Sequence, residues 1–167
     1  MDLTGTDRWY VLGSALVTTV RAALSASVSR AGMVPGEIAW DNCTCEGVLA
    51  VTVPRIYRSE EFPAEADTVV GVSCQAPYEV AEYTVSVIRC APVPDGQDLA
   101  PEVAELDASS GLLLQDMTET MTAVHGYLCT LAREDNIDNF MVNPAQSAGP
   151  EGACVGFVLR VLVSLAT

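Results

Sequence analysis

The chain contains one histidine, His125, and a cysteine four residues later, Cys129. Residues at this spacing lie on one face of a helix, so a thiol and an imidazole could meet there as nucleophile and base. A catalytic histidine also needs an orienting group and a substrate within reach. Its other helical neighbours, Met121, Thr122 and Leu128, are not orienting acids. We therefore expect a structural or surface histidine, with a Cys–His pair as the alternative.

Cysteine is the second residue type that could do chemistry. Cys43-Thr44-Cys45 is one residue short of the redox Cys-x-x-Cys motif, and a four-thiolate zinc site would also need the isolated Cys74 and Cys90. The acidic start, Met1-Asp2-Leu3, is unlike a signal peptide. Several cysteines also lie in apolar segments, where cysteine packs as a small hydrophobe. We predict reduced, buried cysteines and no metal or cofactor for the six, which are Cys43, Cys45, Cys74, Cys90, Cys129 and Cys154.

Carboxylates cluster at Glu60, Glu61, Glu65 and Asp67. Paired carboxylates do acid–base chemistry when a pocket holds them, but this cluster falls in a segment with loop composition. The chain has no lysine, so it lacks the phosphate-binding Gly-x-x-x-x-Gly-Lys motif, and neither Gly-x-Gly-x-x-Gly nor Gly-x-Ser-x-Gly occurs. We interpret the acids as a solvated loop and predict that the protein is not an enzyme.

Charge and composition exclude further classes of protein. The chain has eight basic residues, all arginine, and 22 acidic residues, which gives a formal net charge of −14. Such a surface repels the phosphate backbone and argues against nucleic-acid recognition. The most apolar segment, 153–166, is too short for a membrane span and contains Arg160. Cations that are all arginine indicate a GC-rich genome.

Hydrophobic periodicity predicts the elements that position these residues. A helical stripe through Trp9, Leu12 and Leu16 predicts a first helix of about six turns, which ends near Gly32. Apolar residues that alternate along the chain predict strands. A second, longer helical stripe runs to Leu131. The predicted strands span about 46–57, 78–91 and 155–163, and the second helix spans about 101–131.

The predicted order is helix-strand-strand-helix-strand, in one α+β domain over residues 1–167. We expect a small, mostly antiparallel sheet packed against two long helices. Two long loops, at about 58–77 and 135–152, interrupt the pattern, and loops of this length are commonly functional.

Three segments carry a resemblance to a known family: Ala39-Trp40-Asp41-Asn42-Cys43-Thr44-Cys45-Glu46-Gly47-Val48-Leu49, Tyr83-Thr84-Val85-Ser86-Val87-Ile88-Arg89-Cys90-Ala91-Pro92-Val93-Pro94, and Leu113-Leu114-Gln115-Asp116. With them the chain, over roughly residues 8–165, resembles the small head-to-tail connector proteins of siphophages that infect actinobacteria. The order of elements is most similar to the tail terminator. Adaptor subunits of the same neck are mostly helical, and stoppers are mostly β-barrels.

The resemblance implies a structural virion protein at the tail–neck junction, assembled in the host cytoplasm. A tail terminator forms a homohexameric ring that caps the tube of the major tail protein and joins it to the head-closure or neck protein. DNA passes through its channel during ejection without sequence-specific binding, and neither cofactor nor membrane is involved. The alternatives are another neck component, a stopper or an adaptor, and a non-viral acidic binding module.

The same reading suggests residues that act in assembly. Six copies carry 6 × −14 = −84 formal charges, and an acidic channel would keep DNA from adhering. The scarce arginines can pair with acids of a neighbouring copy, and Pro54 would limit strand pairing along an exposed edge. The alternative is that all are simple surface residues. Our candidates for the interface or the channel are Glu60, Glu61, Glu65, Asp67, Arg55, Arg58, Arg89 and Arg160.

Overall fold

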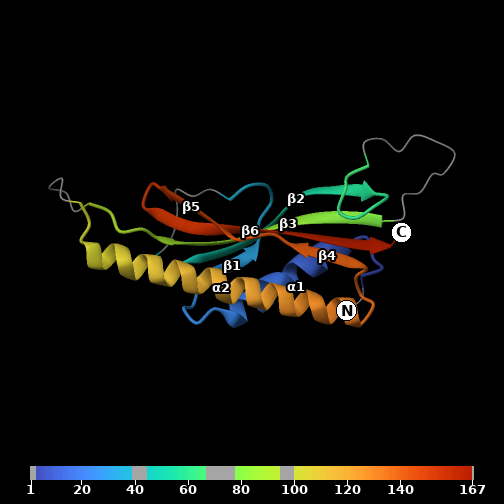
Figure 1. Ribbon diagram of the computed structural model, residues 1–167, viewed down its shortest axis with the longest axis horizontal. Coiled ribbons are helices and arrows are strands. Elements are labelled where there is room, and N and C mark those ends of the chain that lie inside the picture. The colour runs from blue at the N-terminus through green and yellow to red at the C-terminus, as the bar shows by residue number, and fades with distance from the viewer. Residues whose placement is uncertain (1–2, 39–44, 67–77, 95–99, 167) are drawn as a thin grey trace.

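The computed structural model describes residues 3–38, 45–66, 78–94 and 100–166. Two helices and six strands make up these parts of the chain (Figure 1). In chain order they are α1 (Arg8–Ala23), β1 (Arg30–Met33), β2 (Val48–Ser59), β3 (Tyr78–Cys90), α2 (Val103–Arg133), β4 (Asn139–Val142), β5 (Gln146–Glu151) and β6 (Cys154–Ala166).

The six strands form one sheet in the order β1-β2-β3-β6-β4, and β5 also pairs with β6. β1 and β2 are parallel, and the other pairs are antiparallel. β3 and β6 form the longest pair, which runs in register from Tyr78 opposite Ala166 to Cys90 opposite Cys154. β4 and β5 follow one another along the same edge of β6. The predicted α+β fold with a mostly antiparallel sheet is therefore confirmed.

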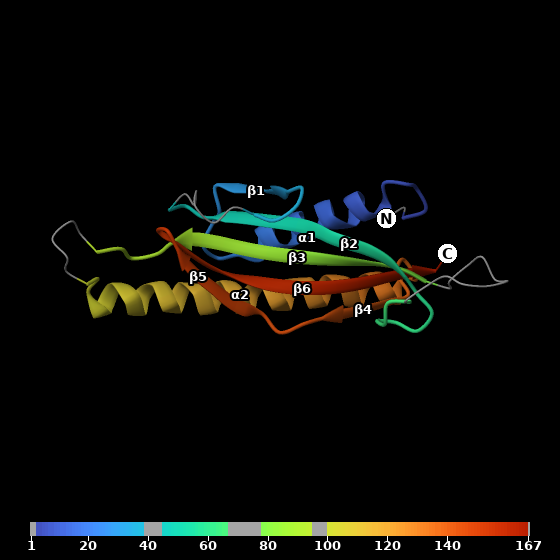
Figure 2. The same ribbon diagram turned by 90° about the horizontal axis from the view of Figure 1, so that it is seen from above.

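Both helices cover the same face of the sheet (Figures 1 and 2). α1 packs on β1 and β2, and α2 packs on β4 and β6. Alternate residues of each long strand face the helices, so β3 and β6 bury one apolar row each, which includes Tyr83 and Phe157. The core lies between this row and the helical stripes, which include Leu12 of α1 and Leu128 of α2.

The structure corrects three sequence-based predictions of element bounds. The first helix ends at Ala23, well before Gly32, because Leu24 is already extended. The predicted loop 135–152 contains β4 and β5, and Arg58 and Ser59 of the predicted loop 58–77 belong to β2. β4 and β5 have no buried side chains, so no apolar alternation marks them, and backbone pairing with β6 makes them strands. Residues 67–77 lie outside the described parts.

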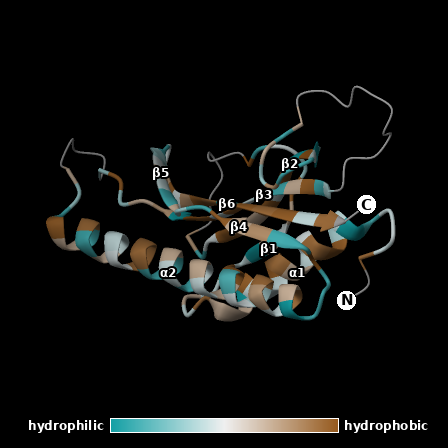
Figure 3. Ribbon diagram, turned by 45° about the vertical axis from the view of Figure 1, so that its right-hand side comes forward, coloured by the Kyte–Doolittle hydropathy of each residue, from teal (hydrophilic) through white to brown (hydrophobic). Residues whose placement is uncertain are grey.

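α2 extends well beyond the sheet at its N-terminal end (Figure 1). Its buried residues begin at Asp116 and continue to Leu131. Before Asp116 the helix has exposed apolar side chains, with Val103 79%, Leu106 44% and Leu114 62% exposed. Figure 3 shows hydrophobic residues on this end of the helix. We call residues 103–115 the free end of α2.

Candidate functional site

The predicted acidic cluster meets one predicted arginine at the end of β2. The guanidinium of Arg55 donates to Glu82 at 2.6 Å and to Glu65 at 2.8 Å. The hydrogen bond to Glu82 raises the pKa of Arg55 above its ordinary value, and burial opposes this. Glu60 and Glu61 are exposed. Asp67 lies outside the described residues.

Arg58 and Arg160 also lie at the surface, each near a carboxylate of β3. Arg58 is 3.3 Å from Glu79, and Arg160 is 4.0 Å from Glu82. Glu79 is more firmly held from the other side, because Arg8 and Trp9 of α1 donate to it at 2.6 and 2.7 Å. Both arginines therefore keep N–H groups free for another partner.

Arg89, also predicted for the interface or the channel, is a different case, because its cationic group is already paired within the chain. Its side chain is buried and donates to both carboxylate oxygens of the buried Asp116 on α2, at 2.6 and 3.1 Å. It also donates to the carbonyl oxygens of Ala26, Ser27 and Glu46. The guanidinium thus joins the α1–β1 connection, the start of β2, and α2.

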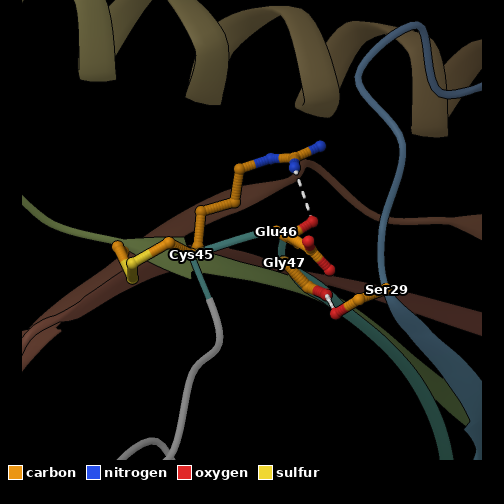
Figure 4. Close-up of a disulfide and its surroundings, with 6 residues drawn as sticks. Ser29, Cys45, Glu46 and Gly47 are labelled. Carbon is orange, nitrogen blue, oxygen red and sulfur yellow. Dashed lines mark hydrogen bonds between the residues drawn. A yellow bond between two sulfur atoms is a disulfide. The ribbon is translucent and has the colours of Figure 1, made fainter.

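The backbone beside Arg89 shows why glycine is needed at position 47. Gly47 has φ +88°, and a Cβ there would lie 2.8 Å from Nη1 of Arg89. Its carbonyl accepts a hydrogen bond from the hydroxyl of Ser29 at 3.1 Å (Figure 4). Gly47 therefore lets the β2 lead-in pass close to the guanidinium.

The prediction of reduced cysteines is wrong for Cys45 and Cys90, which form a disulfide with 4.7 Å between their Cα atoms (Figure 4). The strand register explains the pairing. Val48 of β2 lies opposite Ile88 of β3, and these two strands are antiparallel. Cys45, three residues before Val48, therefore lies near Cys90 at the end of β3. Cys154 is also disulfide-bonded, and Cys129 is free.

The alternative Cys–His pair does come together on α2. The sulfur of Cys129 lies 3.7 Å from Nδ1 of His125, whose ring packs edge-on against Phe140 at 5.8 Å. Neither contact orients the imidazole as a carboxylate would. Within the described ranges, no group of three or more His, Cys, Asp or Glu side chains is placed to hold a metal ion.

A groove lies where the free end of α2 passes the end of β3. Its volume is about 620 Å³. Its walls are mainly apolar, with Glu105 and the Arg89–Asp116 pair as its charged members. Sequence analysis missed it, although three successive leucines at 112–114 put apolar side chains on more than one face of the helix. We call it the α2 groove, and its apolar lining consists of Ala91, Pro92, Val93, Ala108, Leu112, Leu113 and Val155, with Cys90 beside them.

A second cavity, of about 670 Å³, lies on the sheet face away from the helices. Its lining is polar, with Thr84 and Ser86 of β3 next to Arg55, Glu82 and Arg160. The paired charges there leave no cluster of a single sign.

Comparison of the chain with protein-family models and with curated proteins finds no match. In the described parts of the chain, neither helix has the combination of length and apolar character that crossing a membrane requires. The described parts of the chain thus present an apolar groove on a projecting helix and, separately, arginine and glutamate pairs at the end of β2.

Proposed function

We propose that this chain is the tail terminator of a siphophage, a structural virion protein whose six copies form a ring. The ring caps the tail tube, joins it to the neck and leaves a channel for DNA. The observation that carries the proposal is the free end of α2, where apolar side chains and the α2 groove are exposed in a single chain. Contiguous exposed apolar surface is typical of protein–protein contacts.

The architecture supports this member of the neck over its neighbours. Two helices on one face of a six-stranded sheet suit the α+β tail terminator better than a mostly helical adaptor or a β-barrel stopper. This argument rests on the resemblance of the sequence segments described above.

Charge and disulfide bonding suit the same role. The net charge of −14 in each copy gives a ring an acidic surface that DNA passes without adhering. Glu60 and Glu61 are exposed and available to such a channel. Disulfides persist at virion surfaces but are rare in the cytosol, so the Cys45–Cys90 bond fits a protein that ends in a released particle.

The test is the mass of the purified protein, by light scattering and native mass spectrometry, with and without purified tail tubes. We expect six copies of 17.6 kDa, about 106 kDa, and a ring in negative-stain images, either alone or at tube ends. If the protein stays monomeric and binds neither tubes nor neck proteins, the proposal is contradicted and an acidic binding module is favoured. Binding to neck proteins but not to tubes indicates a stopper or adaptor.

A further inference from the structure

The α2 groove offers an apolar site with an acidic border. Besides Glu105 in its wall, the exposed Glu102 lies one turn earlier, at the N-cap of α2. The chain has no arginine from residue 90 to residue 132, so nothing in this stretch of sequence neutralises them. A partner that fits the groove therefore presents an apolar side chain with cations beside it.

The end of β2 presents that combination. Ile56 is 50% exposed, and Arg58 projects from the same face of the sheet with its side chain about half exposed. Arg55 projects from the opposite face, where it pairs with Glu82. β1 pairs with β2 only as far as Val51, so among the described strands residues 55–59 pair with β3 alone. We call Arg55–Ser59 the β2 edge.

The β2 edge is suited to docking through side chains. The amide of Ala66 already donates to the carbonyl of Arg58 at 3.0 Å, which partly closes the edge to another strand. Ile56 lies opposite Ala81 and Arg58 lies opposite Glu79, so these two side chains project from the same face of the sheet. An isoleucine and an arginine two residues apart can therefore enter one site together.

The two surfaces lie at opposite ends of the long axis of the molecule (Figures 1 and 2). One chain therefore cannot bring its own β2 edge to its own α2 groove. A second copy can, and the contact is then heterologous, which builds a ring where the rotation between copies closes. Copies with a charge of −14 repel one another, so a contact that places arginines against acids is also the one that lowers this repulsion.

We propose that the β2 edge of one copy docks in the α2 groove of the next, with Ile56 seated between the groove's leucines and Arg58 against Glu105. This inference rests on the proposed function insofar as it requires copies to assemble. The inference adds which two surfaces meet. If rings form through other surfaces, the inference is wrong and the proposed function is unaffected.

The experiment is a charge swap in the full-length chain, with self-association measured by sedimentation and light scattering. Arg58→Glu and Glu105→Arg are each expected to weaken association at least about tenfold, the factor that 1.4 kcal/mol represents. The double variant restores the opposite charges across the contact and is expected to recover association. Arg21→Glu is the matched control, because it changes an exposed arginine on α1 and alters net charge by the same amount as Arg58→Glu.

A second pair of variants tests the apolar half of the contact. Ile56→Ser is expected to weaken association about tenfold, since it removes a side chain that the contact would bury. Met121→Ser, which changes an exposed methionine on the second half of α2, is the control and is expected to leave association unchanged. Circular dichroism melts of every variant show whether the fold is retained.

The outcomes separate this inference from the proposed function. If the wild type forms rings and the Arg58 and Ile56 variants do so equally well, the surfaces named here are wrong while the ring stands. If the single variants weaken association no more than Arg21→Glu, or the double variant does not recover it, the Arg58–Glu105 contact is excluded. A wild-type chain that never associates, even with tubes, overturns both proposals.

Discussion

Removing Asp116 is expected to destabilise the fold severely. The carboxylate is 1% exposed and is the only acid that the guanidinium of Arg89 contacts in the described structure. In Asp116→Ala, Arg89 keeps its three carbonyl acceptors but loses its only ion pair in the described structure and remains as a buried cation. Breaking a buried pair in this way costs about 3–5 kcal/mol. That is a large part of the free energy of unfolding of a typical domain.

Urea denaturation followed by circular dichroism measures this cost. With a slope of about 2 kcal/mol per molar urea, a loss of about 4 kcal/mol lowers the midpoint by about 2 M. Asp107→Ala is the control, because Asp107 is an exposed aspartate on the same helix and is expected to change stability by less than about 0.5 kcal/mol. Measurements at low protein concentration keep self-association from adding to the apparent stability.

Asp116→Asn separates the charge from the hydrogen bonds. Asparagine keeps one acceptor for Arg89 but removes the negative charge, so its midpoint is expected between those of the wild type and Asp116→Ala. If Asp116→Ala unfolds at the same urea concentration as Asp107→Ala, the buried pair does not hold α2 on the sheet, and the reasoning fails.

Two further predictions concern stability. Burial alone would raise the pKa of Glu79, but hydrogen bonds from Arg8 and Trp9 outweigh it and lower the pKa below its ordinary 4.5. The ionised Glu79 therefore stabilises the fold fully above about pH 4.5, and this stabilisation is lost as the pH falls through the lowered pKa. The urea midpoint of Glu79→Gln should fall less steeply with acid than that of the wild type. Parallel curves of midpoint against pH for the two proteins would contradict this. Replacing Cys45 and Cys90 with serine opens a loop of 45 residues and is expected to lower the free energy of unfolding by about 4 kcal/mol. Equal melting temperatures for this variant and its oxidised parent would show that the bond adds no stability.

The elements that could be predicted from sequence are those with long, buried, periodic segments. The stripe through Leu12 and Leu16 and the alternation around Tyr83 each continue for several turns or strand repeats, because one face packs in the core along the whole length. β1, β4 and β5 have no such signal. β1 and β4 have four residues each and β5 is mostly exposed, so none of them has a long buried face that a sequence pattern could show. Backbone pairing with β2 or β6 makes them strands.

The candidate site was predictable only in part, and the arginines show why. Arg58 and Arg89 both follow apolar strand residues and look alike in sequence. Arg89 is buried because Asp116, 27 residues later, meets it from α2. The α2 groove was missed for a related reason. Leu112 and Leu113 continue the apolar stripe of the helix, and only the three-dimensional structure shows that this part of α2 extends beyond the end of the sheet.

The position of Arg89 also bears on the order of folding events. Its partners at Ala26 and Asp116 come from segments 63 and 27 residues away in opposite directions along the chain. The guanidinium is fully enclosed only when these segments and the start of β2 have met, and we therefore predict that its contacts form after the main barrier to folding. Interactions that form this late slow unfolding and leave the folding rate nearly unchanged. The pair is therefore expected to act mainly on how long the folded chain lasts, a property that would suit the proposed role in a released particle.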